Sequence, residues 1–122
     1  MKKIILPFLF LFPFFLSSQK INEKNTKVNF EVSGNCIMCK KRIEKSALLS
    51  MGVKYASWDI PSNKLTVIYD PRKNTSDSIQ KLISDVGHDT SLFPSSDEVY
   101  NELPICCLYE RKINYSKEKN PQ

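Results

Sequence analysis

The chain has 122 residues and a formal net charge of +5, so it has room for one domain besides any leader. The basic excess is mild, and no basic stripe is interleaved with aromatic residues, which argues against a nucleic-acid-binding protein. Four cysteines in so short a chain point to thiol chemistry.

Residues 1–18 have the pattern of a secretory signal peptide. A basic start, Met1-Lys2-Lys3, precedes an apolar run from Ile4 to Leu16, and the small residues Ser17 and Ser18 follow it. A membrane anchor would need roughly 20 apolar residues, and this run is shorter and contains two prolines. We therefore expect export, cleavage after Ser18, a periplasmic or other extracytoplasmic location and no stable membrane insertion afterwards.

The next part of the chain predicts a strand, a helix and a hairpin. Apolar and polar residues alternate from 26 to 32, as in a half-buried strand. Residues 39–50 have apolar positions at helical spacing, and Gly52 follows as a helix stop. Residues 53–60 and 65–69 are two strands separated by a turn, which predicts a hairpin.

A second amphipathic helix follows, capped by Thr75 or Ser76 and ended by Gly87. Residues 88–93 then predict a loop or a short last strand. The order βαββα, with this final β, is that of a ferredoxin-like βαββαβ sandwich. The predicted fold class is therefore α+β, with one antiparallel sheet and two helices on one of its faces.

Cys36 and Cys39 lie where the first strand passes into the first helix, just after Gly34. A loop thiol and a thiol in the first helical turn can point at one atom, and a helix N-terminus lowers a thiol pKa. Two thiolates suit near-linear Cu(I) or Hg(II), whereas Zn(II) prefers four ligands. Two alternatives use the same pair: a thiol–disulfide oxidoreductase, and a disulfide-stabilised adaptor without metal.

Three other side chains are candidate ligands, and a fourth is a possible accessory to the site. Cys106 and Cys107 are adjacent, and they can complete a four-thiolate site, form a second metal site or form disulfides with the first pair; four cysteines allow three pairings. His88 is the only histidine, and it is either a packing residue or a third ligand that tunes the thiolates. Met38, between the first two cysteines, is at most an accessory thioether.

One face of the first helix is basic. It is either a solvated face or an electrostatic docking patch for an acidic partner beside the metal. The residues concerned are Lys40, Lys41, Arg42 and Lys45.

Four motifs of residues 26–93 together match a known family: Gly34-x-Cys36-x-x-Cys39, Ile43-Glu44, Gly52-Val53 and Val67-x-Tyr69-Asp70-Pro71. By these motifs, residues 26–93 resemble the heavy-metal-associated domain, a ferredoxin-like module of copper chaperones, metal-ATPase N-terminal domains and mercury-transport periplasmic proteins. The resemblance implies that Cys36 and Cys39 bind a soft metal ion without catalysis, and that a transporter or ATPase donates or accepts it. Residues 94–112 also resemble an extension of exported bacterial members with a Leu-Pro-x-Cys-Cys-x-Tyr motif.

The sequence therefore predicts an exported, non-enzymatic protein that captures a soft ion through Cys36 and Cys39 and transfers or sequesters it. Cu(I) is the first choice of ion, with Hg(II) and Zn(II) as alternatives. The predicted organisation is a signal peptide at 1–18, a polar leader at 19–25, a heavy-metal-associated domain at 26–93, a Cys-Cys extension at 94–112 and a disordered tail at 113–122.

Overall fold

A computed structural model describes residues 25–112 of the chain. The predicted signal peptide, nearly all of the polar leader and the C-terminal tail lie outside the described residues. Among residues 25–112, no helix combines the length and the apolar composition needed to cross a membrane.

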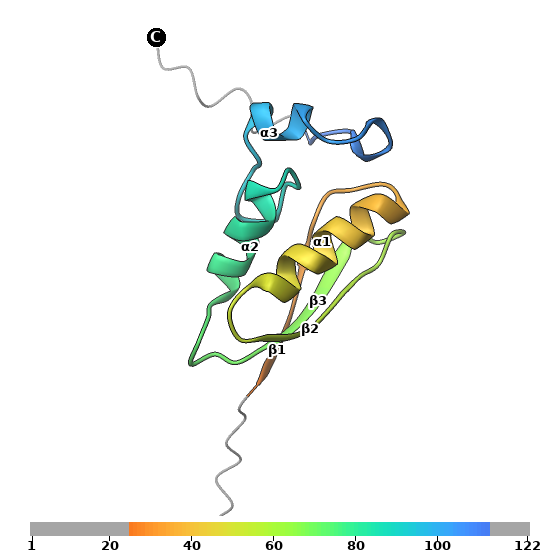
Figure 1. Ribbon diagram of the computed structural model, residues 1–122. Coiled ribbons are helices and arrows are strands. Elements are labelled where there is room, and N and C mark those ends of the chain that lie inside the picture. The colour runs from red at the N-terminus through yellow and green to blue at the C-terminus, as the bar shows by residue number, and fades with distance from the viewer. Residues whose placement is uncertain (1–24, 113–122) are drawn as a thin grey trace, which may run out of the picture.

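The domain is built on a three-stranded antiparallel sheet with the spatial order β1–β3–β2. Val67 in the central strand pairs with Val28 on one side and with Ala56 on the other. Helix α1 runs across the sheet and packs beside α2 (Figure 1). This arrangement confirms the expected ferredoxin-like α+β fold. The bounds are β1 Thr26–Glu31, α1 Ile37–Leu49, β2 Val53–Trp58, β3 Lys64–Tyr69 and α2 Ser76–Asp85.

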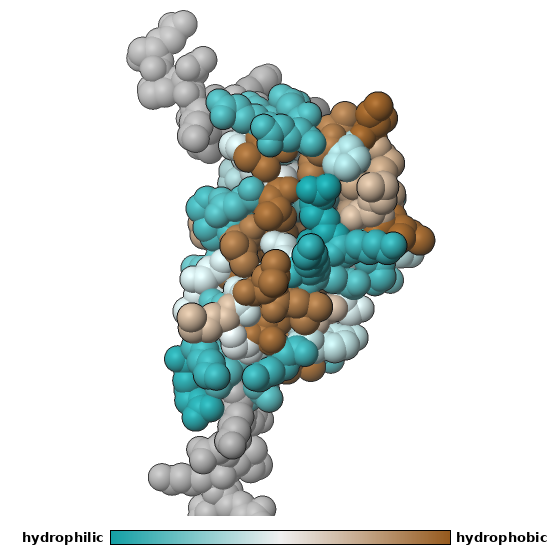
Figure 2. All heavy atoms as spheres, viewed as in Figure 1, coloured by the Kyte–Doolittle hydropathy of each residue, from teal (hydrophilic) through white to brown (hydrophobic). Residues whose placement is uncertain are grey.

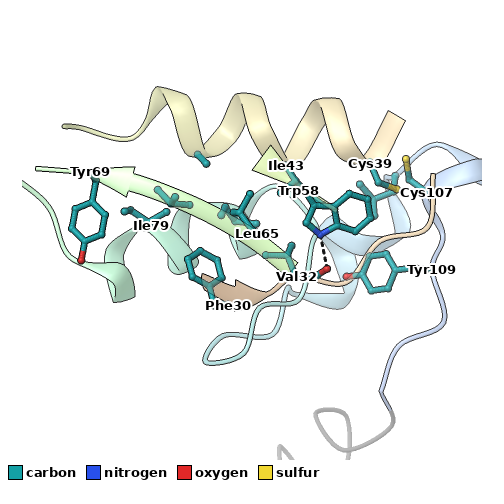
Figure 3. Packing of buried hydrophobic residues seen from close by; sticks show 14 residues of the cluster. Phe30, Val32, Cys39, Ile43, Trp58, Leu65, Tyr69, Ile79, Cys107 and Tyr109 are labelled. Atoms are coloured by element: carbon teal, nitrogen blue, oxygen red, sulfur yellow. Dashed lines mark hydrogen bonds between the residues drawn. The ribbon is translucent and has the colours of Figure 1, made fainter. Parts of the chain in front are cut away.

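The core is formed by the apolar faces of the sheet and the two helices. Trp58, Leu65, Ile43 and Ile79 are fully buried in it, and Figure 3 shows them within the cluster of buried side chains. Helix α2 begins where Thr75 caps it, because the Thr75 hydroxyl accepts a hydrogen bond from the Ser78 N–H. Thr75, rather than Ser76, is therefore the cap.

The expected last strand is reduced to a single bridge between Val32 and Thr90. Its backbone still bonds to the end of β1, since the Ser33 N–H donates to Asp89 and the Ser91 N–H donates to Glu31. The segment does not continue as a strand, because the Thr90 N–H is turned back to the carbonyl of Phe93.

The extension after residue 93 shares the core of the domain. It contains a short helix, α3 (Asp97–Asn101), and a 3₁₀ turn, η1 (Ile105–Cys107), which lies near the start of α1 (Figure 1). Leu103, Cys107 and Tyr109 are buried members of the same hydrophobic cluster as the sheet residues. The two segments predicted as 26–93 and 94–112 therefore pack as one unit.

Gly87 lies against Leu103 of the extension. Its φ is +113°, which L side chains rarely adopt, and a Cβ there would lie 2.8 Å from Leu103 Cδ2. We expect Gly87→Ala to lower the free energy of unfolding by about 2 kcal/mol through backbone strain and displacement of Leu103. Urea denaturation measures this loss, and an unchanged midpoint would show that the extension does not depend on this contact.

Candidate metal centre

The loop before α1 is held against Trp58. The indole Nε1–H donates to the Val32 carbonyl over 3.0 Å, and a Cβ on Gly34 would approach the indole ring to 3.0 Å and Cys39 Cβ to 3.1 Å. Gly34 does not have a left-handed φ, so backbone conformation does not explain why this residue is glycine. Glycine is required because the loop backbone lies directly on the indole ring.

Cys36 and Cys39 lie at the N-terminus of α1. Cys36 is the N-cap residue and Cys39 is in the first turn, because the helix begins at Ile37, two residues earlier than predicted. Their Sγ atoms are 3.3 Å apart, and Cys39 Sγ is 3.4 Å from Asn35 Oδ1. Cys36 is partly exposed and Cys39 is buried, so the pair is open to solvent on the Cys36 side.

The extension brings two further thiols to this pair. Cys107 Sγ lies 3.5 Å from Cys36 Sγ, and Cys106 Sγ lies 4.0 Å from Cys107 Sγ. The sulfur atoms of Cys36, Cys106 and Cys107 all lie within 4.8 Å of one another. Figure 3 shows Cys39 and Cys107 together at one end of the core. All four cysteines are free thiols, since a disulfide needs a sulfur separation of about 2.05 Å.

The thiols differ in how readily they ionise. Burial raises the pKa of Cys36, but attraction to the Cys39 backbone N–H and hydrogen bonds from the neighbouring thiols outweigh it and lower this pKa to about 7. Burial of Cys107 raises its pKa, and the hydrogen bond with Cys36 raises that of Cys106. Because metals bind the thiolate form, Cys36 is the candidate ligand whose thiol ionises near neutral pH.

Met38 and His88 have different positions relative to the thiols. Met38 is half exposed, and its Sδ lies 3.2 Å from Cys106 Sγ, so it borders the cluster. His88 is fully buried; its Nδ1 lies 2.9 Å from the Ser33 carbonyl, its ring stacks on Tyr109, and its Nε2 has no partner in the described structure. In this environment His88 acts as a packing residue, one of the two alternatives for it. Its main polar contact is the Ser33 carbonyl, just before the cysteine loop.

Burial of the His88 ring lowers its pKa to about 4; Arg42 on α1 adds to the shift, and the Ser33 carbonyl and Asp89 oppose it. The unfolded chain, with a histidine pKa of about 6.5, binds more protons between these values. The His88 contribution is therefore complete above pH 6.5 and is lost as the pH falls towards 4, by about 3 kcal/mol.

Urea denaturation of the metal-free protein at several pH values measures this dependence. His88→Gln keeps an N–H donor for the Ser33 carbonyl but does not titrate, so its unfolding free energy should change much less over this interval. Equal pH dependence in the two proteins would assign the effect to carboxylates instead.

The basic face of α1 is only partly available to a partner. Lys40 Nζ is 3.0 Å from Glu44 Oε2 and 2.7 Å from the Trp58 carbonyl, so this residue ties α1 to β2. Arg42 is partly buried, with its Nε enclosed, whereas Lys41 and Lys45 are exposed. The part of the expected patch that faces solvent therefore centres on Lys41 and Lys45.

Comparisons with known proteins agree with this geometry. No family model matches the chain. A CopZ metallochaperone structure is 26% identical, with a TM-score of 0.52 over 53% of this chain and 98% of that one. The Cu(I)-loaded N-terminal domain of a potential copper-translocating P-type ATPase from Bacillus subtilis is 25% identical, with a TM-score of 0.53 over 62% and 95%.

Oxidized MerP from Ralstonia metallidurans CH34 shares the fold, at 22% identity and a TM-score of 0.53 over 55% of this chain and 94% of that one. These matches cover little more than half of the chain, and the chain has the Cys36-x-x-Cys39 pair at the start of α1 within the same βαββα order. The described residues therefore have the ferredoxin-like fold of the heavy-metal-associated domains found in copper chaperones and metal-transporting ATPases.

Proposed function

We propose that this protein is an exported carrier or store of a soft metal ion, with Cu(I) as its first candidate cargo. The observation that carries the proposal is the pair of sulfur atoms of Cys36 and Cys39, 3.3 Å apart at the N-terminus of α1. Soft thiolates prefer Cu(I), Hg(II) and Zn(II) among biological metals, and the helix dipole favours the negative charge of ionised thiols. The CopZ metallochaperone and the Cu(I)-loaded ATPase domain named above support the same class of ligand.

The site is suited to transfer of the ion by ligand exchange. Cys36 is partly exposed while Cys39 is buried, so an incoming thiolate of a partner can reach the ion beside Cys36. Such an exchange needs no general acid or base and no covalent intermediate. We therefore assign a binding and transfer role rather than catalysis.

A transporter or ATPase that donates or accepts the ion would dock around the start of α1. Ile37, Met38 and Ile105 are exposed by 62%, 51% and 89%, and apolar residues gather at this end of the molecule (Figure 2). Lys41 and Lys45 add positive charge nearby, which favours an acidic partner surface.

Native mass spectrometry of the reduced protein tests the proposal. The protein is titrated anaerobically with Cu(I), Zn(II) and Hg(II), and the wild type should retain an ion that Cys36→Ser/Cys39→Ser does not. A wild type that retains none of these ions would overturn the proposal. Turnover in a dithiol–disulfide assay would favour the oxidoreductase that uses the same cysteine pair.

Export rests on residues 1–18 and has its own test. Expression of the full chain in a bacterium should yield a periplasmic protein whose N-terminus is Gln19. Recovery of an uncleaved chain in the cytoplasm would contradict this assignment and leave the metal-binding proposal in place.

A further inference from the structure

The extension delivers thiols to the Cys36–Cys39 pair in a fixed arrangement. Cys107 is fully buried, and its Sγ lies 3.5 Å from Cys36 Sγ. Cys106, its neighbour in η1, is exposed, and its Sγ completes a triangle with the other two whose sides are all within 4.8 Å. Cys36, Cys106 and Cys107 therefore form a triangle of thiols, and Cys39 adjoins it through Cys36, whose Sγ lies 3.3 Å away. Cys39 and Cys107 are buried, whereas Cys106 is exposed.

Contacts on both sides of η1 hold these thiols in place. After the turn, the Tyr109 hydroxyl donates to the Gly87 carbonyl over 2.8 Å and accepts from the Asp89 N–H over 2.9 Å. Arg111 makes a two-pronged ion pair with Asp89, through Nε at 3.0 Å and Nη2 at 2.8 Å. Before the turn, Leu103 packs on Gly87. The position of η1 is thus set by buried hydrogen bonds rather than by the thiols themselves.

Three of the sulfur separations are close to those around a single ion. Two thiolates bound to Zn(II) at about 2.3 Å in a tetrahedral site lie about 3.8 Å apart. The observed separations of 3.3 Å, 3.5 Å and 4.0 Å bracket this value and exceed that of any disulfide. Cys39 Sγ lies outside the triangle of Cys36, Cys106 and Cys107, so its side chain has to rotate towards them to close the site around one ion.

We propose that Cys106 and Cys107 complete a four-thiolate site with Cys36 and Cys39, which binds one divalent soft ion of the Zn(II) or Cd(II) class. This inference rests on the proposed function, because it adds ligands to the same pair. Ions that prefer four ligands gain the most affinity from the added thiolates, whereas Cu(I) needs fewer thiolate ligands. The extension thereby adds the retention of a divalent ion to the proposed handling of Cu(I), and the exposed Cys106 is the ligand through which the divalent ion enters.

Heteronuclear NMR of the wild-type protein loaded with ¹¹³Cd(II) tests this ligand set directly. One cadmium resonance should correlate with the β protons of all four cysteines. Correlations to Cys36 and Cys39 alone would overturn the four-thiolate site and leave the proposed function intact. Failure of the wild type to retain Cd(II), Zn(II), Hg(II) or Cu(I) would instead contradict the proposed function itself.

Affinity measurements provide a second test of the four-thiolate site. Competition with a chelator should show that Cys106→Ser/Cys107→Ser weakens Cd(II) binding more than 100-fold, while the variant still loads one Cu(I). The matched control is Leu108→Ser, which alters the exposed end of the same turn without removing a thiol and should leave Cd(II) affinity within about twofold. Unchanged Cd(II) affinity in the double variant would exclude the extension from the site.

Discussion

Cys36→Ser should weaken Cu(I) binding more than any other single cysteine replacement, by well over 100-fold. Cys36 Sγ lies within 3.5 Å of the sulfur atoms of both Cys39 and Cys107, and its pKa of about 7 supplies a thiolate at neutral pH. Changing residues that merely support metal ligands already costs about 10–100-fold in affinity. Loss of the shared thiolate should therefore exceed that range, because serine offers a hard hydroxyl that stays protonated.

Competition for Cu(I) with a chromophoric chelator measures the effect in reduced, metal-free protein. Cys39→Ser is the informative comparison, because Cys107 remains beside Cys36 in that variant and can replace the missing ligand. The expected order of loss is Cys36→Ser, then Cys39→Ser, then Cys106→Ser. Equal losses for Cys36→Ser and Cys39→Ser would mean that the ion uses only the two-cysteine pair.

Local patterns were sufficient to predict the first part of the site. Strand alternation in β1, the helical spacing of α1 and the cap at Thr75 are determined by neighbours in sequence, and the structure confirms them. The Cys36-x-x-Cys39 spacing also fixes its own geometry, because both residues belong to one helix start. What spacing did not show was that α1 starts at Ile37 and that Asn35 contacts the Cys39 thiol.

The remaining part of the site, which the extension supplies, is determined by long-range contacts that no local sequence pattern encodes. The position of Cys107 depends on Tyr109, whose hydroxyl bonds to backbone groups 20 and 22 residues away. Trp58 at the end of β2 is fully buried under the cysteine loop, a contact that its strand position alone does not predict. Lys40, expected to face solvent, binds Glu44 and the Trp58 carbonyl. A signal was available for the extension: an apolar Leu103 and an aromatic Tyr109 flank the Cys-Cys pair.

Tyr109→Phe should lower the free energy of unfolding by about 4 kcal/mol. The Tyr109 hydroxyl is the partner of both the Gly87 carbonyl and the Asp89 N–H in the buried interior. Phenylalanine keeps the ring, which stacks on His88 and meets Tyr100 edge-on, so the substitution isolates the hydroxyl. Two buried backbone groups would lose a partner, at about 2 kcal/mol each.

Urea denaturation of the metal-free protein measures this loss, and Tyr55→Phe is the matched control. Tyr55 is 48% exposed on β2, so removal of its hydroxyl should change stability by less than about 0.5 kcal/mol. Since Tyr109 also positions η1, Tyr109→Phe should weaken Cd(II) binding although every thiol remains. A variant that loses stability but keeps full Cd(II) affinity would show that the ion, rather than the Tyr109 hydroxyl, determines where Cys106 and Cys107 lie.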